Sequence, residues 1–588
     1  MSDEKAVSVE KKVEAPKPPP PAGPPGPPPP KNPGFVTLVI DGKEVIAKPG
    51  TNMIEAAKSV GVDIPYYCYH PRLTIAANCR MCMVESSAAP PGKLVPACQT
   101  GISEGAVIKT NTDKVRDQQK MVMEFLLLNH PVDCSICDQA GECKLQDYYM
   151  RYDFEPSRLE GGKVLRNKRK KLNELIVLDQ ERCVLCTRCV RFMDEVAKQP
   201  QLGVFGRGSH EVVDISPAYG KLESNYSGNI VDLCPVGALL NTDFRFRARA
   251  WFLSAAPSTC TGCSRGCSIY SDFMGQDTYR YRPRENEQIN KSWICDQGRM
   301  SYKSLNKHRV TQSAVGRGKD IKDVTNADAL KAAAEKLKAM EGKVAFMASP
   351  VASNEDLLAG LAFARDVLKV KSVFVSGRPD GEADNFLMRA DKNPNRKGLE
   401  HIAKGFGLEV KAFVELTKGI DAGSIKAVYA LGAEVPENED TFAARVEKLE
   451  LFIVSATNET KVTAAAHVIL AAAVHVEDEG TFTQGDGITQ RHRRAYPPKG
   501  HSVPHWKWAV DLARAMGLEM KAASSREVFK QLAPSVPELA AFEWDKLAPM
   551  NQKRPGISTM AAGADGRPPG WREQGVPNLR GLTLPPGT

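Results

Sequence analysis

The sequence lacks both a membrane-spanning segment and an export signal. None of its 588 residues belongs to an apolar run of about 18 residues, the length that a helix needs to cross a bilayer. The N-terminus shows no positively charged segment followed by an apolar one, which is the pattern of a secretion signal. We therefore expect a cytoplasmic chain that reaches a membrane only through other proteins.

Cysteine is absent before Cys68 and after Cys295. In a chain without an export signal, Cys-x2-Cys spacing favours metal ligation over disulfide bonds. When His130 is counted, the 15 cysteines form four sets of four soft donors without remainder. The first set is Cys68, Cys79, Cys82 and Cys98; the second is His130, Cys134, Cys137 and Cys143; the third is Cys183, Cys186, Cys189 and Cys234; the fourth is Cys260, Cys263, Cys267 and Cys295. Four such donors suit a tetrahedral metal or an iron-sulfur cluster, and we interpret the sets as four iron-sulfur centres.

Signatures of nucleotide or nucleic-acid binding are absent as well. No Gly-x-Gly-x-x-Gly or Walker sequence follows a predicted strand, and no basic and aromatic residues interleave in the RNA-binding manner. The formal net charge of +9 counts every thiol as neutral. Four oxidised iron-sulfur centres would bring about −7, so the basic residues are expected to balance cluster charge.

The first set lies in a segment that resembles a ferredoxin. Apolar residues alternate in 35–47 around the turn Asp41-Gly42, which predicts a β-hairpin, and Asn52 with Glu55 predicts a capped helix. This order is typical of a β-grasp ferredoxin, whose cysteine loop holds a 2Fe-2S cluster. The gap of ten residues after Cys68 departs from the four of plant-type ferredoxins, and structural zinc remains the alternative.

The second set follows a predicted helix. Thr112 can cap this helix, the residues Val115, Val122, Phe125, Leu126 and Asn129 form its predicted core-facing stripe, and His130-Pro131 ends it. A histidine at a helix end most often only interacts with the helix dipole. Three nearby cysteines that lack a fourth donor favour ligation by His130 instead, and a zinc site remains the alternative.

The third set has the Cys-x2-Cys-x2-Cys spacing of bacterial ferredoxins, and its remote Cys234 precedes a proline, as in those proteins. The basic run 166–171 before it is predicted to be a solvated loop. The fourth set has the spacing Cys-x2-Cys-x3-Cys with a returning Cys295, which fits either a zinc ribbon or a 4Fe-4S site.

After His308 the pattern is that of an α/β protein. Apolar runs of strand length at 343–348, 372–376, 427–432 and 451–455 alternate with predicted helices such as 327–340 and 355–368, which indicates a parallel, doubly wound sheet.

The order of the four sets, with His130 among them, closely resembles the large iron-sulfur subunit family of respiratory complex I, the NADH-quinone oxidoreductases, over about residues 35–500. The resemblance implies a 2Fe-2S cluster at the first set, a histidine-ligated 4Fe-4S cluster at the second, and 4Fe-4S clusters at the third and fourth. In this family the fourth cluster occurs only in some bacterial members and lies off the main electron path. A bacterial or archaeal source follows, and many members continue well past residue 588.

Two later segments, 284–299 and 479–487, are similar to the molybdopterin oxidoreductase fold, which the family shares without its active metal. Every cysteine is already assigned to a set, so none is left to hold molybdenum, and no molybdopterin is expected. An iron hydrogenase would need four further cysteines. A formate dehydrogenase or hydrogenase complex is the alternative assembly, and a zinc-stapled scaffold is the alternative without redox chemistry.

The expected fold class is multidomain α/β and α+β. Its predicted parts are a Pro-rich disordered tail (1–34), a β-grasp 2Fe-2S domain (35–112), a 4Fe-4S domain ligated by one histidine and three cysteines (113–158), a ferredoxin-like 4Fe-4S domain (159–252), a molybdopterin-oxidoreductase-type 4Fe-4S domain (253–309), a truncated molybdopterin-oxidoreductase-like α/β domain (310–544) and a flexible tail (545–588).

The resemblance also implies the function and the partners. Electrons would come from a flavin-bearing, NADH-binding subunit, with a small 2Fe-2S subunit nearby, and would leave towards the quinone-arm subunits. The chain itself would hold no substrate, acid, base or nucleophile and bind no nucleic acid. Its expected place is the cytoplasmic face of the bacterial inner membrane, as a peripheral part of the proton-translocating complex.

Overall fold

The computed structural model describes residues 34–153 and 155–547, so most of the two predicted tails, 1–34 and 545–588, lies outside the described residues. The chain forms two compact units. One contains residues 1–66 and 77–122, and the other contains residues 67–76 and 123–588.

The first unit is built on a five-stranded sheet in the order β2-β1-β5-β3-β4. The predicted hairpin is confirmed, since β1 and β2 pair antiparallel around Asp41 and Gly42, both of which have positive φ. The predicted cap is confirmed too, because the Asn52 side chain accepts a hydrogen bond from the Glu55 backbone N–H at 3.0 Å. The elements are β1 (Val36–Ile40), β2 (Lys43–Ala47), α1 (Met53–Ser59), β3 (Met83–Ser86), β4 (Leu94–Pro96) and β5 (Val107–Lys109).

Helix α2 (Asp113–Leu128) ends two residues before His130, as predicted, and Thr112 Oγ1 accepts a hydrogen bond from the Val115 N–H at 3.3 Å. Part of the predicted core stripe is wrong, because Phe125 is 75% exposed. A helix turns about 100° per residue, which places Phe125 well off the line through Val115 and Val122. The buried face instead continues through Gln119 and Met123.

The part of the second unit that carries the later cysteines consists of short elements. A sheet in the order β10-β7-β6, a β8-β9 pair and a sheet in the order β11-β12-β13 frame the cysteine loops. The elements are α3 (Lys144–Tyr148), β6 (Lys170–Lys171), β7 (Ile176–Leu178), α4 (Arg188–Glu195), β8 (Leu202–Phe205), β9 (Val212–Ile215), α5 (Asn229–Leu233), β10 (Leu239–Asn241), β11 (Ser254–Thr259), β12 (Ser268–Met274), β13 (Asp277–Pro283), α6 (Asp296–Met300) and α7 (Lys303–Asn306).

An eight-stranded sheet in the order β15-β14-β21-β20-β19-β16-β17-β18 forms the centre of the remaining part. The strands from β21 to β18 are parallel, as predicted, and β14 and β15 add an antiparallel edge. The strands are β14 (Ser313–Val315), β15 (Lys322–Val324), β16 (Val344–Ala348), β17 (Ser372–Val375), β18 (Glu409–Ala412), β19 (Ala427–Leu431), β20 (Leu451–Ala456) and β21 (Val468–Ala471).

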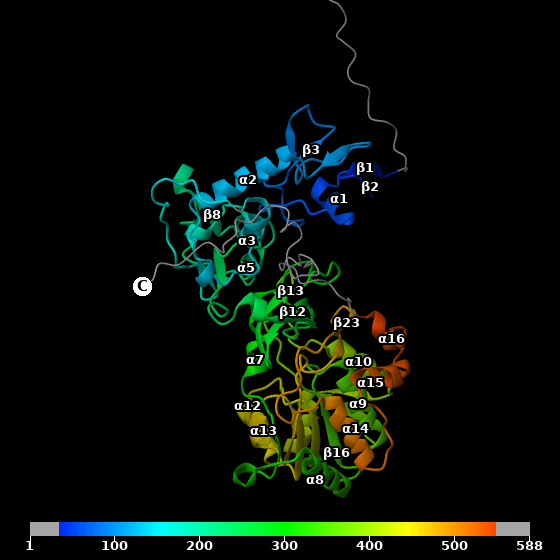
Figure 1. Ribbon diagram of the computed structural model, residues 1–588. Coiled ribbons are helices and arrows are strands. Elements are labelled where there is room, and N and C mark those ends of the chain that lie inside the picture. The colour runs from blue at the N-terminus through cyan, green and yellow to red at the C-terminus, as the bar shows by residue number, and fades with distance from the viewer. Residues whose placement is uncertain (1–33, 154, 548–588) are drawn as a thin grey trace, which may run out of the picture. The chain divides into compact units, whose positions relative to one another are not determined.

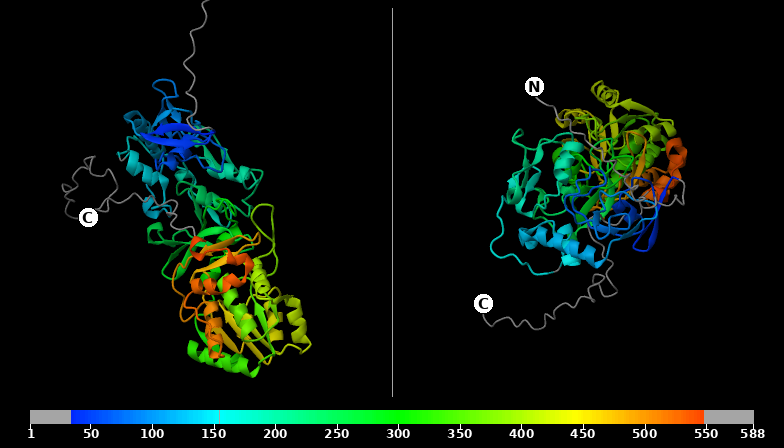
Figure 2. Two further views of the ribbon diagram at one scale, coloured as in Figure 1. Left: turned by 90° about the vertical axis from the view of Figure 1, so that its right-hand side faces the viewer. Right: turned by 90° about the horizontal axis from the view of Figure 1, so that it is seen from above.

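Helices cover both faces of this sheet. Phe346 and Tyr429 point into a cluster with α8, α9, α10, α14 and α15, whereas their strand neighbours Met347 and Val428 point to the other face, which α11, α12 and α13 cover. In Figure 1, α12 and α13 lie on the opposite side of the sheet from α9 and α14. The left view of Figure 2 shows the orange to red C-terminal helices beside the α/β part, where α14 and α15 contact α9. The helices are α8 (Asn326–Ala339), α9 (Asn354–Asp366), α10 (Arg396–Gly405), α11 (Phe413–Asp421), α12 (Glu439–Val446), α13 (Lys461–Ala464), α14 (His505–Ala515), α15 (Ser525–Leu532) and α16 (Pro537–Ala540).

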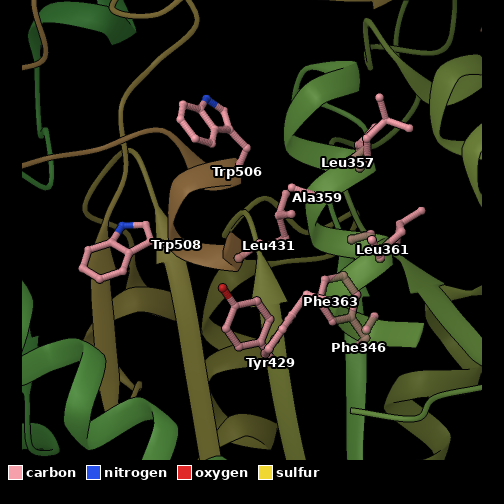
Figure 3. Close-up of a cluster of buried hydrophobic side chains, with 14 of the residues drawn as sticks. Phe346, Leu357, Ala359, Leu361, Phe363, Tyr429, Leu431, Trp506 and Trp508 are labelled. Carbon is pink, nitrogen blue, oxygen red and sulfur yellow. The ribbon is translucent and has the colours of Figure 1, made fainter. Parts of the chain in front are cut away.

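Large side chains fill the first of these two cores. Phe346 and Tyr429 stack at 5.4 Å between ring centroids, and Trp508 from α14 lies near them (Figure 3). Fully burying one such aromatic side chain contributes about 1.5–3 kcal/mol, so this core holds the α/β part together.

A hairpin that sequence reasoning did not foresee joins the α/β part to the fourth set. It consists of β22 (Gly480–Thr483) and β23 (Thr489–His492). Gln490 of this hairpin donates to the Gly266 carbonyl at 2.7 Å and accepts from Ser268 Oγ at 2.5 Å, on either side of Cys267. In the described parts of the chain, no helix is long and apolar enough to span a membrane.

Candidate iron-sulfur centres

The four cysteines of the third set line one small cavity, together with apolar side chains such as Val213 and Val236. A short 3-10 turn, Gln180–Arg182, leads into Cys183. Leu185 and Thr187 adopt positive φ, which bends the chain between the three closely spaced cysteines. The sequence pattern and the tertiary structure therefore group the same four residues.

Burial keeps the thiols of the third set protonated when no metal is bound. It raises the pKa of Cys183 to about 12 and that of Cys234 to about 11. The neighbouring thiols of the set add to the pKa rise of Cys189. Iron would supply the positive charge that makes four buried thiolates stable, and binding would release protons.

The fourth set is equally enclosed. The Cys260 N–H donates to the Cys267 carbonyl at 2.8 Å, and all four cysteines are buried. Cys295 caps α6, since its sulfur accepts the Gly298 N–H at 3.3 Å. Burial raises the pKa of Cys295 to about 11, with a further contribution from Cys263.

Glycines allow the backbone to approach the sulfur atoms of the fourth set. A Cβ atom at Gly298 would lie 3.0 Å from Cys260 Sγ and 3.2 Å from Cys295 Sγ. The Gly262 N–H points at Cys260 Sγ at 3.4 Å. Backbone N–H donors directed at sulfur are a means by which iron-sulfur proteins adjust the cluster potential.

In the second set, Cys137 and Cys143 are buried and Cys134 is exposed. Cys134 contributes to the pKa rise of Cys137, and Cys137 contributes to that of Cys143, so the three thiols lie near one another. Burial and then the charge of Arg182 lower the pKa of His130 to about 4. The imidazole is therefore neutral near pH 7, as a ligand must be. The participation of His130 in the set remains a prediction.

The two units divide the first set. Cys79, Cys82 and Cys98 lie in the first unit, and Cys68 lies in the second. Their joint ligation of one cluster therefore also remains a prediction. Among residues 34–153 and 155–547, no three His, Cys, Asp or Glu side chains are placed to hold a single metal ion.

Three contacts, none foreseen from the sequence, connect the sets of the second unit. Arg191 donates to the carbonyls of Cys68 at 2.6 Å and of Cys186 at 3.2 Å, which joins Cys68 to the third set. A Cβ atom at Gly237, three residues after Cys234, would lie 2.2 Å from Cys137 Sγ, which places the third set against the second.

The third and fourth sets share a hydrogen-bonded seam. Buried Asn229, on the helix that leads to Cys234, donates to the Ile294 carbonyl at 2.8 Å and accepts the Ile294 N–H at 3.0 Å. Asp296 accepts from Ser227 Oγ at 2.7 Å and from the Gly228 N–H at 2.8 Å. In the sequence, these hydrogen-bonding residues are marked only by their positions close to Cys234 and Cys295.

The basic run 166–171 is in part the solvated loop that was predicted. Residues 166–169 form no helix or strand, and the side chains of Lys168 and Lys170 remain 40% and 37% exposed. Lys170–Lys171 form strand β6, which was not predicted. Lys168 pairs with Asp133 at 2.7 Å and with Glu181 at 2.6 Å, and Lys170 pairs with Asp214 at 2.7 Å. Arg166 contributes its positive charge to the surroundings of Cys183, so the run places paired charges beside the second and third sets.

A cavity lies at the carboxyl ends of the parallel strands, where open α/β sheets commonly bind ligands. Its lining includes the carboxylates Asp356, Glu434, Asp478 and Glu479 against one guanidinium, that of Arg378. It contains no cysteine. This lining does not suit an anionic pterin phosphate or a thiolate-held molybdenum ion, so we derive no chemistry there.

Comparison with known protein families divides the chain in the order of the cysteine sets. It matches the families described as a 2Fe-2S iron-sulfur cluster binding domain (35–113), the NADH-ubiquinone oxidoreductase-G iron-sulfur binding region (119–158), the NADH-quinone oxidoreductase subunit 3 ferredoxin-like domain (173–240), the molybdopterin oxidoreductase Fe4S4 domain (253–307) and molybdopterin oxidoreductase (383–515). Together with the buried thiol sets, these matches define a multidomain protein with 2Fe-2S and 4Fe-4S binding domains.

Two proteins of known identity match the iron-sulfur part of the chain. The G subunit of NADH-quinone oxidoreductase from Rickettsia bellii is 40% identical over 321 residues, which are 54% of this chain and 46% of the relative. The mitochondrial NADH-ubiquinone oxidoreductase 78 kDa subunit of Neurospora crassa is 43% identical over 290 residues, 49% of this chain and 38% of the relative. Over its iron-sulfur part, the chain is therefore similar to the G subunits of NADH-quinone oxidoreductase.

The match with these relatives spans less than half of their length. A solved structure, the NAD+-reducing [NiFe]-hydrogenase in the H2-reduced state, aligns with a TM-score of 0.33 at 25% identity and covers 36% of this chain and 90% of that one. A similarity this low supports no argument about fold or function.

Proposed function

We propose that this chain is an electron-relay subunit of a proton-translocating NADH-quinone oxidoreductase. The first set would hold one 2Fe-2S cluster, and the second, third and fourth sets would each hold one 4Fe-4S cluster. When bound, such clusters transfer single electrons without a substrate site on the chain. The residues supply ligation, burial, spacing and the surrounding charge.

The observation that carries the proposal is the row of contacts between the sets. Arg191 binds the backbone at Cys68 and at Cys186, and the segment from Cys234 to Gly237 lies against Cys137. These contacts support the order first, third, second for the relay. The fourth set adjoins the third through Asn229 and Ile294, as a side branch would.

The second set lies beside exposed aromatic side chains that suit a partner protein. Arg249 donates to the Cys137 carbonyl at 2.7 Å, and the Phe246 N–H donates to Asp138 at 3.0 Å, so this segment is attached to the cysteine loop. Phe246, Trp251 and Phe252 are each more than half exposed. Exposed aromatic residues of this kind favour a protein interface, and we assign it to the next electron acceptor on the quinone side.

The names of the relatives support an assembly with other subunits, and the particular partners are part of our proposal. The flavin-bearing NADH subunit and the small 2Fe-2S subunit would stand on the donor side, and the quinone-arm subunits on the acceptor side. The location would be the cytoplasmic face of a bacterial inner membrane, with membrane contact only through the complex.

The test is iron quantitation and low-temperature EPR on anaerobically purified full-length protein. We expect about 14 iron atoms per chain, from one two-iron and three four-iron centres. Cys183→Ala should lose one four-iron signal and about four iron atoms, and electron transfer from NADH to quinone in the assembled complex should stop. Colourless protein that contains zinc, or full activity in the Cys183 variant, would overturn the proposal.

A further inference from the structure

We propose that the guanidinium of Arg182 sets the reduction potential of the group held by the second set, although Arg182 is the sequence neighbour of Cys183 in the third set. This inference rests on the proposed function, because it assumes that the second set holds a redox cluster. Arg182 is a positioning residue whose charge acts on the cluster without ligating it.

The side chain of Arg182 extends to Gly237, beside Cys137. Arg182 ends the 3-10 turn Gln180–Arg182 and is only 5% exposed. Its Cδ lies 3.7 Å from the position that a Cβ atom at Gly237 would occupy, and that position is 2.2 Å from Cys137 Sγ. The arginine therefore occupies the contact between the second and third sets, on the side of Cys137.

The charge of Arg182 also acts mainly on the second set. Arg182 is the largest influence after burial on the pKa values of Cys137 and His130, and it lowers both. In the third set, Arg166 lowers the pKa of Cys183, and Arg188 and Arg191 lower that of Cys186. Different arginines therefore act on the two sets, and Arg182 acts on the second set although its sequence neighbour Cys183 belongs to the third.

Fixed carboxylates hold Arg182 in place. Its Nη2 lies 3.0 Å from Asp133 Oδ2, and its Nε lies 3.2 Å from Asp179 Oδ2. Lys168 shares Asp133 at 2.7 Å and also pairs with Glu181. Two cations, Arg182 and Lys168, therefore face three carboxylates, so the group as a whole carries a formal charge of −1. Within this group, Arg182 is the member that lies beside Gly237 and Cys137, so its charge acts on the second set at short range.

A positive charge near a cluster favours the reduced state, which carries one more electron. Arg182 would therefore raise the potential of the second-set cluster relative to the third. The third set adjoins the second at Gly237, so this shift would act on the electron-transfer step between the two clusters. Arg182 is next to Cys183 in the sequence, but in the folded chain its side chain lies beside Cys137.

The test is an EPR-monitored redox titration of full-length holoprotein with a crossed pair of variants. Arg182→Gln should shift the midpoint of the second-set signal to more negative potential and leave the third-set signal nearly unchanged. Arg166→Gln should do the reverse. Arg182→Lys, which keeps the charge, should restore most of the midpoint. The two signals are identified as those lost in Cys137→Ala and Cys183→Ala.

An unchanged second-set midpoint in Arg182→Gln would overturn the inference, and so would an equal shift of both signals. Asp133→Asn decides the question if Arg182→Gln loses its cluster. Removing this carboxylate should move the second-set midpoint to more positive potential, and no shift would overturn the inference. Absence of all four-iron signals in the unmutated protein would instead refute the proposed function, so the two failures are distinguishable.

Discussion

Individual residues in this protein affect its cysteines in two ways. Glycines leave room for close packing around the sulfur atoms, and arginines place positive charge near them. Glycines such as Gly237 and Gly298 let backbone segments approach sulfur atoms more closely than any other residue would allow. Arginines such as Arg182, Arg188 and Arg191 lie among the sets, where they balance the charge of buried thiolates. These three arginines are therefore the specific residues that we expect to offset cluster charge.

Gly237→Ala is expected to destroy the second-set centre selectively. Its Cβ atom would lie 2.2 Å from Cys137 Sγ, closer than real atoms approach, so the cysteine or the loop must move. Iron content should fall by about four atoms per chain, while the fourth-set EPR signal persists. Gly220→Ala is the matched control, because its Cβ atom would meet nothing within 4 Å. Unchanged iron content in Gly237→Ala would contradict the prediction.

Glu355→Gln is expected to stabilise the α/β part at alkaline pH. Burial raises the pKa of Glu355 to about 8, so between about pH 4.5 and 8 the folded state holds a proton that the unfolded state has released. Stability from this group therefore falls as the pH rises through that window. In the glutamine variant, the amide oxygen can accept the Thr481 N–H and the amide N–H can donate to Thr481 Oγ1, so both contacts persist without a charge. In thermal unfolding, the melting temperature of the variant should exceed that of the unmutated protein by a few degrees at pH 8.5, and this difference should nearly disappear at pH 5. A difference that does not change with pH would contradict the raised pKa of Glu355.

Secondary-structure elements connect the cysteine loops to the large sheet. The β22-β23 hairpin holds the loop around Cys267 through Gln490, and on its other side Thr481 binds Glu355 at the start of α9. A buried ion pair secures the chain before β14, since Arg309 contacts Glu477 at 2.7 and 2.8 Å and both side chains are almost fully buried.

Glu477→Ala is expected to destabilise the protein by about 3–5 kcal/mol, because it leaves the charge of Arg309 buried without a partner. Denaturant unfolding, followed by tryptophan fluorescence, would measure the loss. Asp421→Ala removes an exposed carboxylate that pairs with Arg445 and Lys448, and it should change stability far less. Equal effects of the two substitutions would show that the buried pair contributes nothing beyond a surface pair.

Across the whole molecule, three cysteine sets share one structural unit, and the contacts between them have an order. The fourth set adjoins the third through the Asn229 seam, whereas the second adjoins it through Gly237. The row from Cys68 through Cys186 to Cys137 does not include the fourth set.

Cys260→Ala and Cys183→Ala are therefore expected to differ in turnover of the assembled complex. Both variants should lose one four-iron EPR signal, but only the Cys183 variant should lose most of the NADH-quinone activity. The two cysteines are matched controls for each other, since each is enclosed and ligates one predicted cluster. If Cys260→Ala stopped turnover as well, the fourth set would belong to the main path.

The spacing of the cysteines predicted that Cys183, Cys186, Cys189 and Cys234 lie together, because three of the four come from one short loop, and these four line one cavity. Ligation of a cluster by each of the four sets stays a prediction. The strands of the large sheet and the caps at Asn52 and Thr112 could also be predicted, since apolar alternation and capping depend on neighbours in sequence. The exposure of Phe125, the ion pairs of the basic run and the role of Gly237 could not be predicted, because they depend on what packs against them from distant segments.

The sequence by itself determined which residues are candidate metal ligands and how they group, because donor type and loop spacing decide ligation, and it left zinc as an alternative to iron-sulfur at three of the four sets. Only the tertiary structure decided which sets are neighbours and which arginine acts on which sulfur. Those relations join residues such as Arg182 and Cys137, or Cys68 and Cys186, that are far apart along the chain. Electrostatic influence depends on distance through space, and chain folding alone sets that distance.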